Sequence, residues 1–525
     1  MLEPAVDKTG STAYHLVVLV HGLWGNRSHL EYISNALKTE FDSRNRSNSG
    51  EQLFVYTAHL NEGYKTYDGI DVCGVRVASE IEEQISALGS VTKFSICGYS
   101  LGGLISRYAL GVLYKRQVFK KRDIKLVNFT TFCTPHVGVY APGKNAAVKL
   151  FNAVVPLVLG NSGKQMFLKD KSKLAGGLPL VLAMSMENSV FYKALQEFES
   201  KSLYANVIND KRTAWWTSGI SRNDPFFDID ENNGHHRFCY VSGYGPIVVD
   251  HTKPVKISRI EDFNERAEEK ARPRQSGENM KVDKQEYFFL NYWIAKLGRW
   301  LMVLINLLLI APLWALWFVI SGTTETIKST IRVTKFVKGY SHQFIQEIYD
   351  IPSSPDHEDD MIETLPDTPG EYELQFQQSL QDQTDTFIES VLSAIERKNT
   401  LSAVVDEAEP CDEKNMSDEG DTGKDFSMRT TLKELELYSV EAIKARHSRS
   451  ASNEKLPSLE NLHLELGPAQ LQIIDSLNKI PWSKFPVYIR NTPSTHACAI
   501  VRHGDPKFGE GKVIVKHWVS EVFSF

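Results

Sequence analysis

Residues 96–111, ICGYSLGGLISRYALG, decide the fold, because they take an apolar strand through a tight turn straight into a helix. Ser100 occupies that turn between Gly98 and Gly102, where a Cβ on either glycine would collide with neighbouring backbone. The helix begins at Leu101, so free N–H groups and the positive end of the helix dipole lie beside the serine. The pattern predicts a nucleophilic serine; the alternative is a glycine-rich turn with no catalytic role.

Short apolar runs and segments of helical length alternate around this turn over residues 14–260. This alternation is typical of an α/β domain with a mostly parallel sheet that helices cover. The expected strands are 16–20, 53–57, 92–97, 125–133 and 203–208, and the expected helices are 28–39, 70–88 and 101–115. The stretch around 147–200 is apolar and helical without a core strand, which predicts an inserted cap.

Composition excludes several classes of protein. A chain of 525 residues, 42% hydrophobic and 24% charged, can bury a large core and is neither wholly disordered nor a polytopic membrane protein. A formal charge of −6 gives no sign of a nucleic-acid binder. The six cysteines lie far apart without a CxxC spacing, which argues against zinc or a disulfide scaffold and fits a reducing compartment.

Cofactor and targeting motifs are also missing from the sequence. It contains no HExxH and no GxGxxG after a strand, so we expect neither a metal nor a nucleotide cofactor. The N-terminal residues MLEPAVDKTGST lack the basic and apolar regions of a secretory signal. We therefore expect the chain to stay on the cytosolic side.

A nucleophilic serine needs backbone donors for the oxyanion, and the first expected strand supplies one candidate. It ends in His21-Gly22-Leu23, ahead of a helix. Hydrolases with this strand–turn–helix serine use the N–H after the serine and an N–H from the loop after an early strand. The predicted donors are therefore Leu101 and Leu23. His21 precedes the serine, against the chain order Ser–Asp–His, and we interpret it as a structural residue that shapes the loop.

The catalytic acid is expected after a later strand. SLYANVIND, residues 202–210, ends in Asp210, which we predict to be the acid. Asp250, next to a histidine, is a rival. The other candidates lie in a loop-like sequence and are more typical of turn carboxylates: Asp224, Asp228 and Asp230.

The general base is harder to predict. His496 follows an expected strand at 487–490, where the last loop of such a sheet presents its histidine. A lone histidine is more often structural than catalytic, so the alternatives stay open at this point. They are His235, His236, His251 and His503.

Residues 300–320 form an almost unbroken apolar run, which as a helix would be about 31 Å long and could span a bilayer. A single crossing would separate His496 from Ser100. Basic residues on both flanks and Pro312 near the middle favour a re-entrant membrane hairpin instead, with arms of about 15 Å. Around it we expect a charged linker at 261–299, a disordered acidic tract at 352–455, and a return to the catalytic core at 469–525.

Several motifs, in this order, resemble those of the fungal putative serine esterase family, which includes lipid-droplet phospholipases. They are HLVVLVHGLWGN, YKTYDGIDVCGVR, GYSLGGLISRYALG, TFCTPHVGV, LYANVINDKRTAWWTSGI and THACAIVR. The resemblance covers residues 14–340 and about 470–505. It implies an α/β-hydrolase fold and a triad of Ser100, Asp210 and His496.

The same resemblance implies cleavage of glycerophospholipid acyl esters on the cytosolic face of lipid droplets and of the endoplasmic reticulum. The implied partners are phospholipid and neutral-lipid substrates and a membrane or droplet monolayer. A monoacylglycerol or triacylglycerol lipase is the alternative within the same class. A catalytically silent, membrane-tethered adaptor is the alternative from another class.

Overall fold

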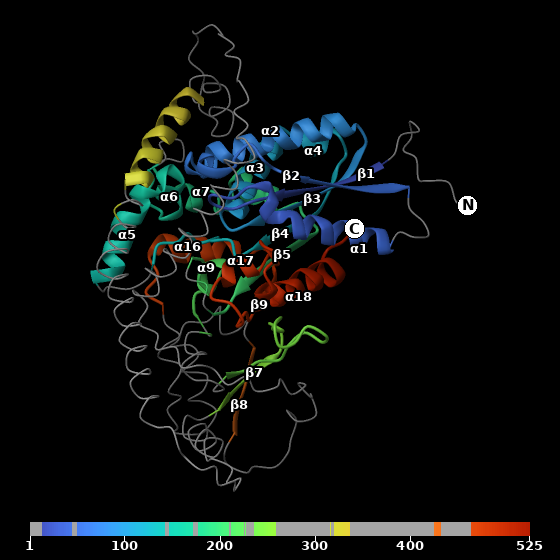
Figure 1. Cartoon of the computed structure of the whole chain (residues 1–525), viewed down its shortest axis with the longest axis vertical. Coiled ribbons are helices and arrows are strands. Elements are labelled where there is room, and N and C mark those ends of the chain that lie inside the picture. The colour runs from blue at the N-terminus through green and yellow to red at the C-terminus, as the bar shows by residue number, and fades with distance from the viewer. Residues whose placement is uncertain are drawn as a thin grey trace, which may run out of the picture.

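A six-stranded parallel sheet, in the order β2-β1-β3-β4-β5-β9, forms the centre of the protein (Figure 1). The computed structural model describes residues 13–44, 50–141, 146–171, 177–208, 210, 212–224, 226, 236–258, 316, 320–336, 425–431 and 464–525. The strands are β1 (Ala13–Val20), β2 (Glu51–Thr57), β3 (Val91–Tyr99), β4 (Lys125–Phe132), β5 (Ser200–Asn206) and β9 (Ser483–Val487). The predicted mostly parallel sheet is confirmed.

Helices cover both faces of this sheet. Alternate residues of β1 enter two different cores, because successive side chains of a strand point to opposite faces. Leu16 and Val18 pack in the core under α2 and α3, whereas Val17 and Leu19 pack in the core under α1 and α18. The helices are α1 (Glu31–Arg44), α2 (Ile70–Leu88), α3 (Leu101–Lys115) and α18 (Gly509–His517). The bounds of α2 and α3 are those that the sequence predicts.

The last strand differs from the prediction. β9 begins at Ser483 and ends at Val487, whereas the apolar pattern favours 487–490. It pairs with β5 through residues 483–487 only. After Val487 the chain turns to a different partner, because Tyr488 donates its N–H to the carbonyl of Ile247 at 2.8 Å. The apolar residues after Val487 are therefore buried without extending the sheet.

The stretch expected to be a helical cap contains four helices. They are α5 (Ala146–Val158), α6 (Gly160–Met166), α7 (Leu180–Ala183) and α8 (Val190–Gln196). Ser162 of α6 donates a hydrogen bond to the carbonyl of Thr66 in η2 (Gly63–Tyr67), which follows β2. Phe191 of α8 packs against Gly111 of α3, where a Cβ would overlap the ring. These helices therefore pack on the carboxyl side of β2 and on α3.

The remaining elements are short. They are η1 (Arg27–Leu30), α4 (Val118–Lys121), α9 (Trp215–Ser218), α16 (Pro468–Leu477), α17 (Thr495–Cys498), η6 (Pro506–Phe508) and η7 (Trp518–Val522). A separate antiparallel sheet joins β6 (His236–Arg237), β7 (Pro254–Ser258) and β8 (Asp425–Thr431). β8 lies within the tract predicted to be disordered, so that prediction is wrong for these seven residues. The rest of 352–455 lies outside the described residues.

Other predicted segments fall largely outside the description. The linker at 261–299 is not described, and of the apolar run at 300–320 only residues 316 and 320 are. Within the described ranges, no helix is both long and apolar enough to cross a membrane. The cysteines differ from the expectation at one position, since Cys239 is disulfide-bonded. Four others are free and buried: Cys73, Cys97, Cys133 and Cys498.

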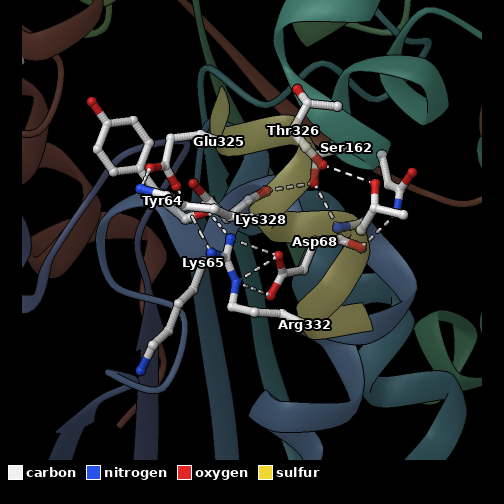
Figure 2. A network of polar contacts seen from close by, with 12 residues as sticks. Tyr64, Lys65, Asp68, Ser162, Glu325, Thr326, Lys328 and Arg332 are labelled. Atoms are coloured by element: carbon white, nitrogen blue, oxygen red, sulfur yellow. Dashed lines mark hydrogen bonds and ion pairs between the residues drawn. The ribbon is translucent and has the colours of Figure 1, made fainter. Parts of the chain in front are cut away.

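Residues 320–336 are helical and attach to the domain of the six-stranded sheet through a buried carboxylate (Figure 2). Arg332 Nη2 lies 2.9 Å from Asp68 Oδ1, and Arg76 Nη2 of α2 lies 2.7 Å from Asp68 Oδ2. The Asp68 side chain is fully buried, whereas the two arginine side chains are 31% and 14% exposed. A buried carboxylate held by two cations fixes the helix against η2 and α2.

Replacing this carboxylate tests the attachment. Asp68→Asn should lower the free energy of unfolding by about 2–3 kcal/mol, because two partly buried guanidinium groups lose their counter-charge. The matched control is Lys125→Gln, which removes an exposed pair with Glu199 and should change stability by less than about 0.5 kcal/mol. Urea unfolding followed by circular dichroism measures both. Equal effects of the two substitutions would show that Asp68 does not hold the helix of residues 320–336 more strongly than an exposed ion pair would.

Candidate active site

Ser100 occupies a strained turn between β3 and α3. Its backbone has φ 54° and ψ −128°, in the left-handed region that residues other than glycine rarely adopt. A Cβ on Gly98 would overlap the backbone of Gly103, and a Cβ on Gly102 would overlap the carbonyls of Val20 and His21. The steric requirement that the sequence predicts at these glycines is therefore present in the structure.

The loop after β1 lies directly against this serine. A Cβ on Gly22 would come within 2.7 Å of Ser100 Cβ and 3.3 Å of Ser100 Oγ. In the described part of the chain, the N–H groups of Leu23 and Leu101 donate no hydrogen bond to the protein. Two unpaired N–H groups, one next to Gly22 and one next to Ser100, are the arrangement that an oxyanion hole requires.

His21 is part of the loop and not of a proton-transfer pair. Its ring is buried, and Nδ1 lies 3.0 Å from the carbonyl oxygen of Gly22. Burial lowers the pKa of His21, which favours the neutral ring. Gly25 packs against the same ring, so tightly that a Cβ there would lie 2.7 Å from Nδ1. These contacts agree with the structural role predicted for His21.

The structure brings the predicted acid and base together, although they are far apart in the chain. His496 Nδ1 lies 2.9 Å from Asp210 Oδ2, across 286 positions of sequence. Both side chains are buried, with 4% and 1% of their surface exposed. Asp210 follows β5, and His496 lies in α17 after β9, so the parallel pairing of β5 with β9 places the two residues at one edge of the sheet.

Asp210 is held as a charged acceptor. Its Oδ1 accepts hydrogen bonds from the N–H groups of Arg212 and Thr213, at 3.1 and 2.9 Å, and its Oδ2 accepts one from Asn206 Nδ2 at 3.1 Å. Burial by itself would raise the pKa of Asp210. The interaction with His496 and the hydrogen bonds from the backbone N–H groups have a larger effect than burial, and together they lower the pKa of Asp210 to about 2. A permanently ionised Asp210 can orient His496 and stabilise its protonated form.

Tyr99 joins this pair to the serine turn. Its hydroxyl donates a hydrogen bond to the backbone carbonyl of His496 at 3.1 Å, and the two ring centroids are 5.0 Å apart. Within the described residues, Ser100 Oγ and the His496 ring are not hydrogen-bonded to each other. Catalytic hydrogen bonds are often long before a substrate binds. Tyr99 therefore connects His496 with the turn that contains Ser100.

The rival carboxylates take other roles. Asp250 accepts hydrogen bonds from the N–H and hydroxyl of Thr252, as a turn carboxylate does. Asp224 accepts one from the N–H of Phe226. Asp228, Asp230 and His235 lie outside the described residues, and the side chain of His236 is not described.

The rival histidines are also engaged elsewhere. The ring of His503 packs against His29 and Phe508. His251 is buried in the turn after Asp250. Of the carboxylates and histidines considered for the triad, Asp210 and His496 form the predicted pair, with 2.9 Å between Oδ2 and Nδ1.

Sequence reasoning missed two residues that contact the dyad. Thr213 donates a hydrogen bond to Asp210 Oδ2 at 3.1 Å and lies 3.3 Å from His496 Nδ1. Its position three residues after an aspartate is a recognisable turn signal. Cys133, after β4, has no such signal and becomes a neighbour only through the sheet.

Cys133, Asp210 and His496 offer ligand atoms within 4.8 Å of one another, which raises the question of a metal. Metal binding requires a thiolate. Burial, and then the charge of Asp210, raise the pKa of the Cys133 thiol well above its usual value. Among these three side chains, Asp210 and His496 contact each other directly, with 2.9 Å between Oδ2 and Nδ1.

Comparison with known proteins finds similarity in the region that contains Ser100 and Asp210. Residues 10–221 match one family. The family is described as putative serine esterase (DUF676), and the match covers less than half of the chain. The predicted resemblance to serine esterases is thereby confirmed.

Its curated relatives are named as lipases. Two are from Saccharomyces cerevisiae: the putative lipase YDL109C, 29% identical over 39% of this chain and 30% of its own length, and the putative lipase ROG1, 28% identical over 41% and 30%. A third is a triacylglycerol lipase of Burkholderia plantarii, 29% identical over 26% of this chain and 33% of its own length. The chain thus spans about a third of the length of the relatives it matches.

Solved structures overlap only partly with this chain. The Bacillus licheniformis lipase BlEst2 is 18% identical, covers 39% of this chain and 38% of its own, and has a TM-score of 0.24. The Legionella pneumophila phospholipase PlaB is 12% identical, covers 40% and 42%, and has a TM-score of 0.26. The fold class of this chain is therefore assigned from its own strand order and strand pairing.

The lowered pKa of Asp210 predicts how stability changes with pH. The carboxylate of the unfolded chain titrates near 3.8 and that of the folded chain near 2, so its contribution is complete above pH 4 and is lost as the pH falls toward 2. Over this range the wild type should lose about 2 kcal/mol more unfolding free energy than Asp210→Asn. Urea unfolding at a series of pH values measures the difference. Parallel pH curves for the two proteins would show that the charge of Asp210 is not stabilised by folding.

Proposed function

We propose that this protein is a serine phospholipase of the α/β-hydrolase type, which hydrolyses acyl esters of glycerophospholipids at a lipid-droplet or membrane surface. The observation that carries the proposal is the buried Asp210–His496 contact, next to a serine on a strained strand–turn–helix. Residues with three complementary roles come from three separate loops at the carboxyl ends of parallel strands. This convergence is difficult to explain by packing alone, because burying an ionised carboxylate is costly.

Acyl transfer through a covalent intermediate follows from these positions. His496 takes the proton from Ser100 Oγ as the oxygen attacks the ester carbonyl carbon, and Asp210 stabilises the resulting imidazolium. The N–H groups of Leu23 and Leu101 then stabilise the oxyanion. His496 returns the proton to the leaving alcohol, and a water molecule, activated by the same histidine, releases the fatty acid.

Three features support a lipid substrate. Relatives of the chain are named as lipases, and the helices of the 146–196 region expose leucine and valine side chains. The apolar run at 300–320 would hold the enzyme at a lipid surface as a re-entrant hairpin. The family resemblance favours glycerophospholipids and the cytosolic face of droplets or the endoplasmic reticulum.

A neutral-lipid hydrolase is the second candidate. One relative is named as a triacylglycerol lipase, and the catalytic groups make the same attack on any acyl ester. A silent adaptor is disfavoured, because a protein without catalysis has no need of the strain at Ser100 or of the buried charge of Asp210.

A lipid panel tests both the class and the substrate. Ser100→Ala should lower fatty-acid release from phosphatidylcholine at least about 10³-fold and abolish fluorophosphonate labelling, because the nucleophile is gone. Ser86→Ala, which changes an exposed hydroxyl in α2, is the matched control and should keep full activity. Normal turnover by Ser100→Ala would rule out the enzymatic proposal. Faster hydrolysis of mono- or triacylglycerol than of phosphatidylcholine would favour the neutral-lipid alternative.

The choice of base has its own test. His496→Asn should lower kcat at least about 10³-fold, because it removes the proton acceptor but leaves an amide that can donate to Asp210; circular dichroism checks that the fold is retained. His251→Ala should retain most of its activity. Steady-state kinetics on a soluble short-chain ester compares the two variants without a lipid surface. Inactivation by the His251 substitution alone would transfer the role of base to that residue.

A further inference from the structure

Helix α5 exposes an apolar stripe to solvent. Leu150 and Leu157 are 65% and 61% exposed, and Ala153 and Val154 are exposed between them. Spacings of three, four and seven residues place all four side chains on one face of the helix. Such a face is normally buried against a partner.

The helix formed by residues 320–336 has a second stripe of the same kind. Ile320, Ile327 and Ile331 are 57%, 58% and 52% exposed, and Leu316 just before them is 57% exposed. Spacings of four and seven residues again place them on one face. In the sequence, the apolar run at 300–320 leads directly into this stripe.

The two helices are in direct contact. Thr326 Oγ1 donates a hydrogen bond to the carbonyl of Leu157 at 3.3 Å. Gly322 lies against Val158 so closely that a Cβ would overlap its side chain, so a small residue is required at this crossing. Figure 1 shows α5 and the second helix along the same side of the molecule. We call the exposed apolar side chains of the two stripes the docking face.

The docking face is fixed relative to the candidate active site. Asp68 binds Arg332 of the second helix, and Ser162 of the adjacent α6 donates to the carbonyl of Thr66 (Figure 2). The hydroxyl of Thr66 in turn accepts a hydrogen bond from the N–H of Trp24 at 3.0 Å. Trp24 directly follows Leu23, the proposed oxyanion donor. A short chain of polar contacts therefore connects the docking face with the loop that faces Ser100.

We propose that the docking face is the surface by which this protein lies on a phospholipid surface. This inference rests on the proposed function, in that the substrate is drawn from the same lipid layer. Its exposed side chains are aliphatic and suit the boundary between headgroups and acyl chains, where amphipathic helices bind. Exposed Lys149 and Lys335 on the same two helices suit anionic headgroups. Continuity in sequence with the 300–320 run favours lipid over a protein partner.

An environment-sensitive label can test this contact on the full-length chain. The fluorophore NBD is attached at Ala153→Cys, in the middle of the α5 stripe, and at Lys120→Cys in α4 as the matched control. The four free native cysteines are buried and should not compete for the label. Vesicles of phosphatidylcholine and phosphatidylserine should shift the emission at position 153 to shorter wavelength, and a lipid-borne quencher should reduce it. The label at position 120 should not respond.

Substitutions in the stripes test the source of this signal. Leu157→Ser with Ile327→Ser should require at least about tenfold more lipid for half-maximal quenching at position 153, because two aliphatic side chains no longer enter the lipid. Leu60→Ser is the control, since Leu60 is 39% exposed outside the two helices. An effect of Leu60→Ser equal to that of the double variant would overturn the proposal.

Other results at position 153 would also overturn it. A label that stays in water while the protein sediments with vesicles would show that another part of the chain makes the contact. An emission already shifted without lipid would indicate that the stripe is covered by the chain itself, or by a second copy if the shift depends on protein concentration. All these readouts work in a Ser100→Ala background, so failure of docking and failure of the proposed catalysis are distinguished.

Discussion

The parallel pairing of β5 with β9 is the interaction on which the rest of the structure depends. It brings residues 464–525 back to the sheet that contains the serine turn, after more than half of the chain has intervened. Without it, the buried charge of Asp210 would lose His496 as a partner. Because closing so long a loop costs conformational entropy, the contact has to be supported by a core of its own. Residues from α17, α18 and η7 provide that core on one face of the sheet.

The site combines a strained backbone with a well-satisfied charge. Ser100 is held in an unfavourable conformation because glycines on either side allow β3, α3 and the loop after β1 to approach closely. Asp210 is the opposite case, since backbone and side-chain donors surround its carboxylate. Ser100 lies half-buried on a strained turn, whereas Asp210 is stabilised by the donors around its buried carboxylate. Both depend on the rigidity of the parallel sheet beneath them.

Segment η2 links the loop near Ser100 with the helix of residues 320–336. η2 contacts the loop after β1 through Thr66, and it contacts the helix of 320–336 through Asp68. A displacement of that helix would therefore act on the same segment that supports the proposed oxyanion donor. The two arginines on Asp68 resist such a displacement, because a buried carboxylate that loses a cation is strongly destabilised.

Local patterns determined much of this protein from sequence alone. The strand–serine–helix turn and the ends of α2 and α3 follow from sterics and hydrophobic spacing among neighbours in the chain, as do five strands of the sheet, to within a few residues. Tertiary structure decided the rest. Only packing could reveal His496 and Cys133 beside Asp210, because these contacts join residues far apart in sequence. The end of β9 and the docking of residues 320–336 were settled in the same way, by backbone and charge partners that no local pattern specifies.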